Sequence, residues 1–517
     1  MKKNLFLLAI TFFVFGKVFA GGLLTNTNQS VSFLRNPARG ASTEIDAAYT
    51  NPAGLAFLSH EGLSLSINNQ SAFQTRTLTT TFAPFAGFGG DATKVFEGKA
   101  KAWVIPSLQA AYKTNKWVFS ANIAVAGGGG TLDFSKGLPS FESQVALLPL
   151  LLTSNGIPAT QYALDSRLKG SSLTIGIQLG ATYKISDQFS AYLGGRASII
   201  DNSYEGYIHN IQANVGGSLV NLNSYFTAAA AQATGAANSL QPIIDGGYGN
   251  APLSMVLSQE QLAKIAAGLG LSEAQAGAMT VSQAQGGFIQ KSTMATGVAT
   301  KTADMNLNTK QTGSGFAPII GLDYKWNNLN VGLTYEFKSS IQLTNKTTEN
   351  STGQAQFDDG FKTPSDIPAL LSIGAKYDIL PALTVSAGYH HFFDSDAKML
   401  GDRQKLINGG TNEYLAGVEY RFNQKFLASC GTQITRNPVE DAFQTDLSYA
   451  LNSMSFGFGG AWNVTENIRI NAAYFFTNYK DWTTETYATD MVGSLPSSST
   501  IFGRTNKTFG IGVDFRF

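Results

Sequence analysis

Charged residues, cysteine and histidine are all scarce in this sequence. Charged residues make up 14% of the 517-residue chain, well below the roughly 25% typical of soluble domains. The chain also lacks any internal run of the roughly 18 apolar residues that a membrane-spanning helix needs. Cys430 is the only cysteine, which excludes an intramolecular disulfide. The formal net charge of +1 argues against nucleic acid as a partner.

Residue types that form catalytic and metal sites are not grouped in the sequence. His390 and His391 are adjacent on a predicted strand, so their side chains point to opposite faces and cannot share a metal. His60 and His209 stand alone. No metal-spaced Cys/His cluster, phosphate-cradling glycine loop or nucleophile elbow is present. We therefore predict no catalytic residue, no metal ligand and no cofactor, and expect that the protein is not an enzyme.

The N-terminus predicts export. Two lysines precede an apolar run over residues 5–15, and the segment ends at the small residue Ala20. This order is typical of a cleaved signal peptide, which we place at residues 1–20, with Gly21 as the mature start. An uncleaved anchor is disfavoured because the apolar run is too short to span a membrane.

From about Gly62 onward, apolar and polar residues alternate with a period of two, as in strands with one apolar face. The two kinds of residue cancel in any average, which accounts for the mean hydropathy of −0.02. A soluble β-sandwich alternates in the same way, so a single strand does not decide the fold. The pattern predicts fourteen strands, near residues 63–76, 99–113, 116–127, 171–184, 188–203, 312–326, 328–343, 367–378, 382–394, 410–422, 425–436, 444–463, 466–480 and 502–517.

The connections between these strands alternate between short turns and mostly long loops, the longest covering roughly 204–311. Bacterial outer-membrane barrels have short periplasmic turns on one rim and long loops on the other, whereas a sandwich has no reason to sort its loops. The chain ends in an alternating stretch closed by Phe517, which resembles the signal read by the outer-membrane assembly machinery. The sequence therefore predicts an all-β protein, a 14-stranded antiparallel transmembrane β-barrel over residues 63–517. We place it in the outer membrane of a Gram-negative bacterium.

Residues 36–58, NPARGASTEIDAAYTNPAGLAFL, fit neither the signal peptide nor the strand pattern. The segment is too polar and too interrupted by Pro and Gly to span a membrane. Its two Asn-Pro-Ala triplets fix φ at the prolines and disfavour helix at the preceding Asn. We interpret residues 21–62 as a compact plug, or hatch, inside the barrel. The alternative is an ordinary linker, since Asn-Pro commonly starts a turn.

The run AYTNPAGLA at residues 48–56 resembles the hatch of the FadL family, the outer-membrane channels for long-chain fatty acids and other hydrophobic compounds. The motif is short, but the strand layout agrees with that family over essentially the whole mature chain. The resemblance implies that Asn51, Pro52 and Ala53 belong to a gating hatch.

The resemblance also implies a kink in the third strand that opens a lateral gap in the wall. The candidates for this kink are four consecutive glycines, Gly127, Gly128, Gly129 and Gly130. Missing side chains weaken a strand and permit a bulge or bend. The four glycines are equally compatible with the start of a loop.

Charged residues on the inward face of the predicted barrel can pair with one another or with the plug. Among them, Arg196 lies near mid-strand and is a candidate contact for a ligand carboxylate. In the long loop, Ser258 and Gln261 predict a helix start with a capping box. The apolar run at residues 147–152 is exposed unless something covers it, and such surface often binds a hydrophobic ligand or membrane.

Together these features predict a monomeric channel for passive uptake of long-chain fatty acids or similar hydrophobic molecules. The hatch gates release, which is lateral, through a wall gap near the third strand. The expected partners are a hydrophobic small-molecule ligand and outer-membrane lipid. The alternative from another class is a structural or adhesive barrel that binds a surface partner through its long loops. A water-filled general porin is a further alternative, against which a plug argues.

Overall fold

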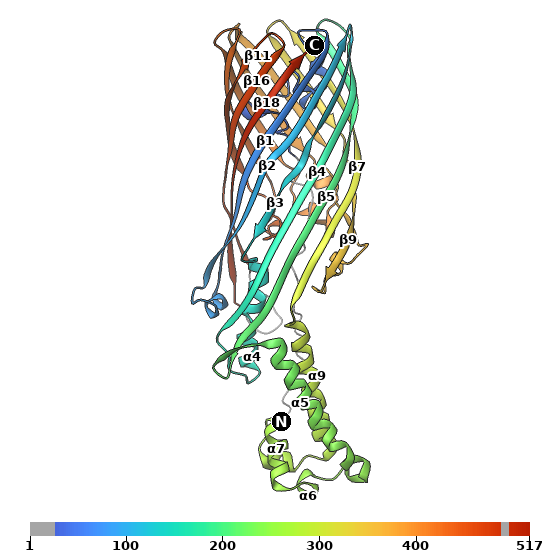
Figure 1. Cartoon of the computed structure of the whole chain (residues 1–517), viewed down its shortest axis with the longest axis vertical. Coiled ribbons are helices and arrows are strands. Elements are labelled where there is room, and N and C mark those ends of the chain that lie inside the picture. Colours follow the sequence, from blue (N-terminus) through green and yellow to red (C-terminus); the bar gives the residue numbers. More distant parts are fainter. Residues whose placement is uncertain (1–25, 487–495) are drawn as a thin grey trace.

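The computed structural model describes residues 26–486 and 496–517. In this part of the chain the strands form one closed antiparallel β-barrel of 14 strands (Figure 1), in which the last strand pairs with the first. The predicted signal peptide at residues 1–20 lies outside the described residues, as do residues 21–25.

The barrel wall is built from long strands in sequence order, each paired with its neighbours in the chain. They are β1 (Gly62–Phe82), β2 (Thr93–Thr114), β3 (Trp117–Phe134), β4 (Tyr162–Lys184), β5 (Phe189–Val215), β7 (Met305–Trp326), β8 (Leu329–Glu336), β11 (Leu370–Leu380), β12 (Leu383–Phe392), β13 (Asn412–Arg421), β14 (Phe426–Arg436), β15 (Ser453–Asn463), β16 (Ile468–Tyr479) and β18 (Ser498–Arg516). Shorter strands extend the sheet at the loop end: β6 (Ser218–Asn221), β9 (Gln342–Asn350), β10 (Lys362–Pro364) and β17 (Trp482–Thr486).

Helices occur before the first strand and in the long loops. The N-terminal ones are α1 (Val31–Arg35), α2 (Ala47–Thr50) and η1 (Pro52–Phe57). Those of the loops are η2 (Ala83–Gly87), α3 (Pro139–Ala146), α4 (Leu148–Ser154), α5 (Leu222–Ile243), η3 (Ile244–Tyr248), α6 (Leu253–Val256), α7 (Gln259–Leu269), α8 (Glu273–Gly277), α9 (Val281–Lys301), η4 (Ala355–Phe357), η5 (Asp394–Asp396), η6 (Leu400–Leu406) and η7 (Asp441–Phe443). Over the described ranges, none of the helices is long and apolar enough to cross a membrane.

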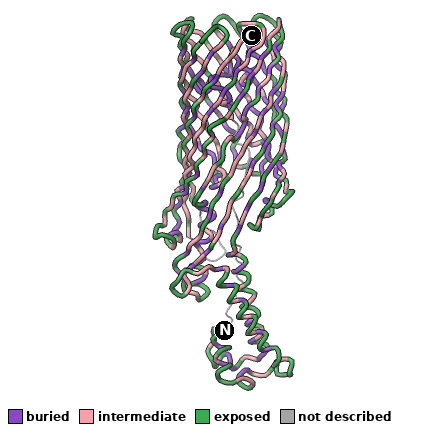
Figure 2. Tube along the Cα trace, viewed as in Figure 1, coloured by how far each residue is buried: buried purple, intermediate pink, exposed green. Residues whose placement is uncertain are grey.

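The wall is apolar outside and polar inside, the reverse of a soluble protein. Leu193 and Phe316 on its outer face are 68% and 60% exposed, whereas the inward Ser190 and Asn122 are 0% and 1% exposed. Figure 2 shows this alternation of exposed and buried residues along the strands. Aromatic residues, Trp326 among them, are exposed beside the short turns, as in the interfacial girdle of a membrane barrel. The chain is therefore an outer-membrane β-barrel, with its short turns on one rim.

The predicted strand at 444–463 is wrong in its first half. The strand starts at Ser453, and residues 444–452 form a loop that follows η7 and folds over the loop end of the barrel. Tyr449 and Leu451 are buried there in a loop core rather than facing lipid. Residues 444–452 therefore belong to a loop, and only residues from Ser453 onward belong to the barrel wall.

The longest loop is shorter than the predicted 204–311, because β5 continues to Val215 and β7 begins at Met305. Between them, α5 and α9 pack side by side as an arm that projects from the loop end of the barrel (Figure 1). α7 begins with the predicted capping box of Ser258 and Gln261. Its apolar residues are buried in a small core at the tip of the arm, which includes Leu262.

Candidate functional site

The N-terminal segment, defined here as residues 26–61, contacts strands on opposite sides of the barrel. α1 packs against β15 and β16, whereas η1 packs against β4, β5 and β7. In the closed strand order these two groups face each other across the lumen. The segment thus contacts strands of both groups, and its residues are almost all buried.

The second Asn-Pro-Ala triplet is fixed to the wall by its own polar atoms. The Asn51 side-chain amide donates to Asp323 Oδ2 at 3.0 Å, and its carbonyl oxygen accepts from Thr334 Oγ1 at 3.0 Å. The carbonyls of Pro52 and Ala53 accept from hydroxyl groups on β4 and β5 at 2.7 and 2.8 Å. Pro52 is the first residue of η1, where its missing N–H costs nothing.

Two glycines of the wall allow the N-terminal segment to approach the strands closely. A Cβ at Gly332 would overlap the Gly40 carbonyl and the Asn51 amide, and a Cβ at Gly374 would overlap the Gly40 backbone. Both glycines are therefore required by the close approach of two backbones, a recurrent reason for glycine inside a strand.

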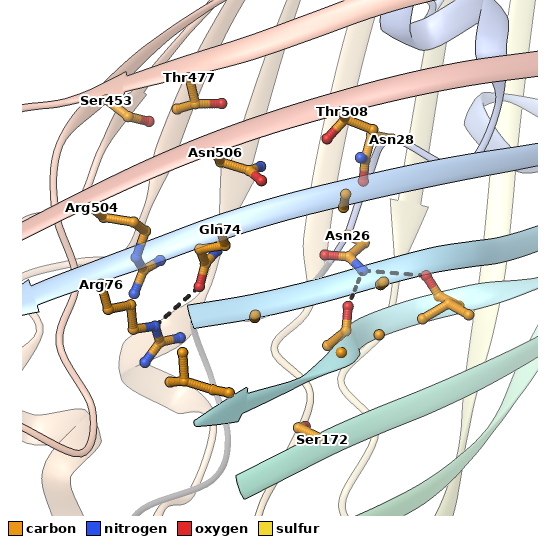
Figure 3. A pocket seen from close by; sticks show the side chains of 18 of the residues that line it. Asn26, Asn28, Gln74, Arg76, Ser172, Ser453, Thr477, Arg504, Asn506 and Thr508 are labelled. Atoms are coloured by element: carbon orange, nitrogen blue, oxygen red, sulfur yellow. Dashed lines mark hydrogen bonds between the residues drawn. The ribbon is translucent and has the colours of Figure 1, made fainter. Parts of the chain in front are cut away.

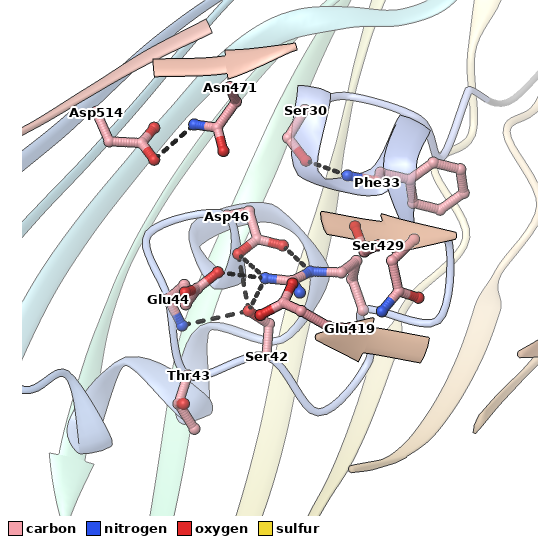
Figure 4. A network of polar contacts seen from close by, with 12 residues as sticks. Ser30, Phe33, Ser42, Thr43, Glu44, Asp46, Glu419, Ser429, Asn471 and Asp514 are labelled. Carbon is pink, nitrogen blue, oxygen red and sulfur yellow. Dashed lines mark hydrogen bonds and ion pairs between the residues drawn. The ribbon is translucent and has the colours of Figure 1, made fainter. Parts of the chain in front are cut away.

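Buried charges brace the same segment internally (Figure 4). The Arg39 guanidinium donates from Nε to Asp46 Oδ2 at 2.6 Å and from Nη2 to Glu44 Oε2 at 2.9 Å. Ser42 Oγ donates to Asp46 at 2.7 Å and receives a bond from Arg39. Burial would lower the pKa of Arg39, but the neighbouring carboxylates outweigh it and raise that pKa well above its usual value.

Other ion pairs tie the segment to the wall. Arg35, with a fully buried side chain, pairs with Glu419 on β13, and Arg469 on β16 pairs with Glu44 at 2.7 Å. Burial would raise the pKa of the Glu44 carboxyl, but three guanidinium groups outweigh it and hold that pKa well below its usual value. These pairs attach the segment on the β13–β16 side of the lumen.

The hydrogen-bond ladder between β2 and β3 is interrupted. Ser107 pairs with Ala124 and Ala100 pairs with Leu132, but residues 101–106 of β2 have no partner on β3. Pro106 stands in this stretch and has no N–H to donate. On β3 the register shifts twice within residues 125–130. We call this interruption the β2–β3 break.

The four candidate glycines lie in the β2–β3 break, but they are not equivalent. Gly128 and Gly129 have φ of +66° and +111°, which side-chain-bearing residues rarely adopt. The glycine run does not begin a loop, because β3 continues to Phe134. The local bulges therefore re-aim a strand that goes on, as β-bulges do.

Gly127 differs from Gly128 and Gly129 in its backbone conformation. It keeps a ladder partner on β4, Thr174, as Gly128 keeps Leu173, whereas Gly129 has none. Its φ is not among the positive ones, so its backbone does not require a glycine. The backbone therefore requires glycine at Gly128 and Gly129, and the period-two pattern could not distinguish the four because none of them has a side chain.

Asn26 supplies hydrogen bonds at the β2–β3 break. Its backbone N–H donates to Ala126 O at 2.8 Å, and its side-chain amide donates to Gly128 O at 3.1 Å and Val125 O at 3.4 Å (Figure 3). Gln29 lies beside it and accepts from Ser107 Oγ at 2.6 Å through its carbonyl. Nothing in the sequence marks Asn26, since its partners are about a hundred residues away.

A cavity of about 430 Å³ connects these features. Its wall includes residues 26–29, residues 128–130 at the β2–β3 break, and the inner faces of β1, β14, β15, β16 and β18. The lining is mixed: Ile105 and Leu132 are apolar, whereas Arg76 and Arg504 carry charge. The two arginines also escaped sequence reasoning, because only barrel closure brings the first and last strands together.

Arg196 lies away from this cavity, beside a void of about 30 Å³. Its guanidinium pairs with Glu336 at 2.8 Å, donates to Gln178 Oε1 at 2.7 Å, and sits 4.7 Å from the centre of the Tyr49 ring. Its donors are thus directed at protein partners. A role as a ligand contact remains a prediction that requires Glu336 to release it.

The apolar run at residues 147–152 is largely covered. Leu148 and Leu152 are buried in a core that also contains Leu222 and Phe226 at the base of the arm, although Leu150 remains 52% exposed. This cover leaves only part of the run available as a contact surface.

Across residues 26–486 and 496–517, no group of three or more His, Cys, Asp or Glu side chains is placed to hold a metal ion.

Comparison with known proteins gives structural matches alone. No protein-family model and no curated protein matches the chain. A Pseudomonas aeruginosa FadL homologue matches with a TM-score of 0.57 at 12% identity, over 96% of this chain and 99% of that one. The Pseudomonas putida toluene transporter TodX matches with a TM-score of 0.49 at 15% identity, over 96% and 99%. The Ralstonia pickettii toluene transporter TbuX matches with a TM-score of 0.45 at 13% identity, over 93% and 98%. The match to the FadL homologue shows that the outer-membrane barrel described here has the FadL-type fold.

Proposed function

We propose that the protein is a channel for passive uptake of long-chain fatty acids or similar hydrophobic molecules across the outer membrane. The observation that carries the proposal is the 430 Å³ cavity, which has the β2–β3 break in its wall. A ligand in this cavity lies beside an interruption of the wall that faces lipid. No energy source is required, because the ligand moves down its own gradient.

We propose that the ligand leaves sideways through the β2–β3 break. Trp103 and Val104, in the unpaired stretch of β2, are 67% and 71% exposed on the outside of the barrel. The absence of ladder hydrogen bonds lowers the cost of separating β2 from β3 at this point. A lateral route also spares an apolar molecule from passing through water at the periplasmic rim.

We propose that the N-terminal segment is the hatch that gates this exit. Asn26 blocks the break by bonding to carbonyls of β3, whereas Asn51, Pro52 and Ala53 anchor the segment on the far side. The moving part is then residues 26–29, which precede the anchored part of the segment. The ion pairs to β13 and β16 keep the rest of the hatch in place as the gate opens.

The proposal is tested with the mature chain in planar bilayers and in lipid vesicles. The intact protein should speed transfer of a labelled fatty acid into the membrane while conducting few ions. Deletion of residues 21–62 should raise ion conductance sharply, because the lumen is then open. An intact protein that already conducts like an open pore would support the general-porin alternative instead.

A further inference from the structure

Two arginines face each other across the seam that closes the barrel. Arg76 on β1 and Arg504 on β18 are directly opposite in register, and both line the large cavity (Figure 3). Like charges directly opposite on neighbouring strands are destabilising. The repulsion between the two arginines must therefore be offset by an anion, or the pair must be retained for some other function.

No anion for this pair comes from residues 26–486 or 496–517. Within the described portion of the chain, no carboxylate forms an ion pair with either arginine. Arg76 Nε donates to Gln74 Oε1 at 3.1 Å, and Arg504 Nη2 donates to the Tyr449 carbonyl at 3.3 Å. Arg504 Nε is buried without a hydrogen-bond partner. By contrast, Arg196, deeper in the lumen, pairs with a carboxylate.

Aromatic rings hold the two guanidinium groups in position. The Tyr449 ring centre lies 5.5 Å from the Arg76 guanidinium carbon and 5.0 Å from that of Arg504. The Tyr479 ring lies 5.3 Å from Arg504. Cation–π contacts stabilise the charges without using their N–H donors, so donors remain free to point into the cavity.

We propose that Arg76 and Arg504 bind the anionic head group of an amphiphilic ligand, so that this channel selects a carboxylate over a neutral hydrocarbon. The inference rests on the proposed uptake function and specifies its ligand. A planar guanidinium matches the geometry of a carboxylate, and two of them supply charge-assisted hydrogen bonds from both sides. The anion also removes the repulsion between the two arginines.

The position of the pair sets the orientation of the ligand. On β1, the β2–β3 break lies level with residues 69–73, and Arg76 lies three to seven residues nearer the loop end. At about 3.3 Å per residue the head-group site is roughly 10–20 Å from the break. The cavity beside the break is lined by Ile105, Val125 and Leu132. The tail therefore points at the exit and leaves first.

The selectivity is tested by the binding of radiolabelled dodecanoate and dodecanol to the full mature chain held in amphipol. The wild type should bind dodecanoate more tightly than dodecanol. R76Q/R504Q should weaken dodecanoate binding on the order of 10- to 100-fold, because the charge-assisted hydrogen bonds to the carboxylate are lost. Dodecanol binding should be unchanged in this variant. R76K/R504K should keep much of the preference, and the exposed Arg436→Gln should match the wild type.

Several outcomes separate the inference from the proposed function. Unchanged dodecanoate binding by a folded R76Q/R504Q variant overturns the head-group site while leaving uptake intact. If that variant does not assemble, R76Q and R504Q alone are measured, and dodecanoate binding equal to the wild type in both has the same meaning. If the wild type binds neither ligand, the proposed function itself fails.

The orientation is tested with dodecanoate brominated at its terminal carbon. Anomalous scattering should place the bromine beside Val125 and Ile105 at the β2–β3 break. Bromine beside Arg76 and Arg504 would overturn the tail-first orientation.

Discussion

At the scale of single residues, the lumen contains two kinds of charge. Arg35, Arg39 and Arg469 pair with carboxylates of the N-terminal segment or the wall, so their role is to seat that segment. Arg76 and Arg504 have no such partners among the residues described. A buried guanidinium is retained at a cost unless it is paired, and this difference separates the structural arginines from the candidate ligand contacts.

Replacement of Glu44 by Gln is expected to loosen the seat of the N-terminal segment. The substitution leaves the guanidinium groups of Arg39 and Arg469 short of a counter-charge, which costs about 2–3 kcal/mol of stability for a mostly buried group. Thermal unfolding of the purified protein at neutral pH measures the loss. Lys264→Gln, at an exposed ion pair on the arm, is the control and should change stability little.

The same variant has a predicted pH signature. The folded-state pKa of Glu44 lies well below the ordinary value of 4.5, so its ionised form stabilises the fold above that pH. This stabilisation is lost as the pH falls from 4.5 toward the folded-state pKa. The wild type should therefore lose more stability than Glu44→Gln between neutral pH and the acid range. Parallel curves for the two proteins would contradict the assigned ion pairs.

At the scale of elements, alternation predicted the wall where it faces lipid, and failed beyond the membrane. The predicted strand at 466–480 is Ile468–Tyr479 in the structure, whereas that at 188–203 extends to Val215. The extension carries polar residues on both faces, so it has no period-two signal. The strand predicted from residue 444 starts only at Ser453. The prediction was wrong because alternate residues of the preceding loop are buried, and this burial produces the same period-two pattern as a strand.

Strand β3 is the element on which the exit depends. Gly129→Ala is expected to lower fatty acid uptake, because a side chain at φ of +111° costs about 1–3 kcal/mol and drives the bulge toward regular pairing. Gly130→Ala is the matched control: its Cβ would have ordinary contacts and no positive φ is imposed. Transfer of labelled fatty acid into vesicles compares the two. Equal rates would show that the bulge geometry does not matter.

At the scale of the whole molecule, the candidate site was only partly predictable. The Asn-Pro-Ala motif drew attention to a segment that contacts the inner wall, and the glycine run to a stretch of β3 with two register shifts. The roles of Asn26, Arg76 and Arg504 could not be predicted from the sequence. Their neighbours are set by barrel closure and by the path of the N-terminal segment along the inner wall. Arg196 was chosen for its mid-strand place, but Glu336 already occupies its guanidinium.

Removal of most of the arm tests the alternative that the protein is an adhesive barrel. Replacing residues 231–291 by a short glycine linker retains the base, where Ser292 Oγ donates to Ala230 O. We expect unchanged fatty acid uptake, because the cavity lining contains no residue of the arm. Loss of binding to a surface partner with uptake intact would assign the arm a separate adhesive role. Loss of uptake would show that the arm collects the ligand.

The central claim is that ligand leaves through the β2–β3 break, and a disulfide across it is the most direct test. A Cβ at Gly130 would lie 3.7 Å from the Ala102 Cβ, within the range for a disulfide. A102C/G130C is made with Cys430→Ser, and A110C/A121C, across the intact ladder, is the control. The account predicts that oxidation of A102C/G130C stops fatty acid transfer, that dithiothreitol restores it, and that the control is unaffected. Full transfer by the oxidised A102C/G130C protein would contradict it.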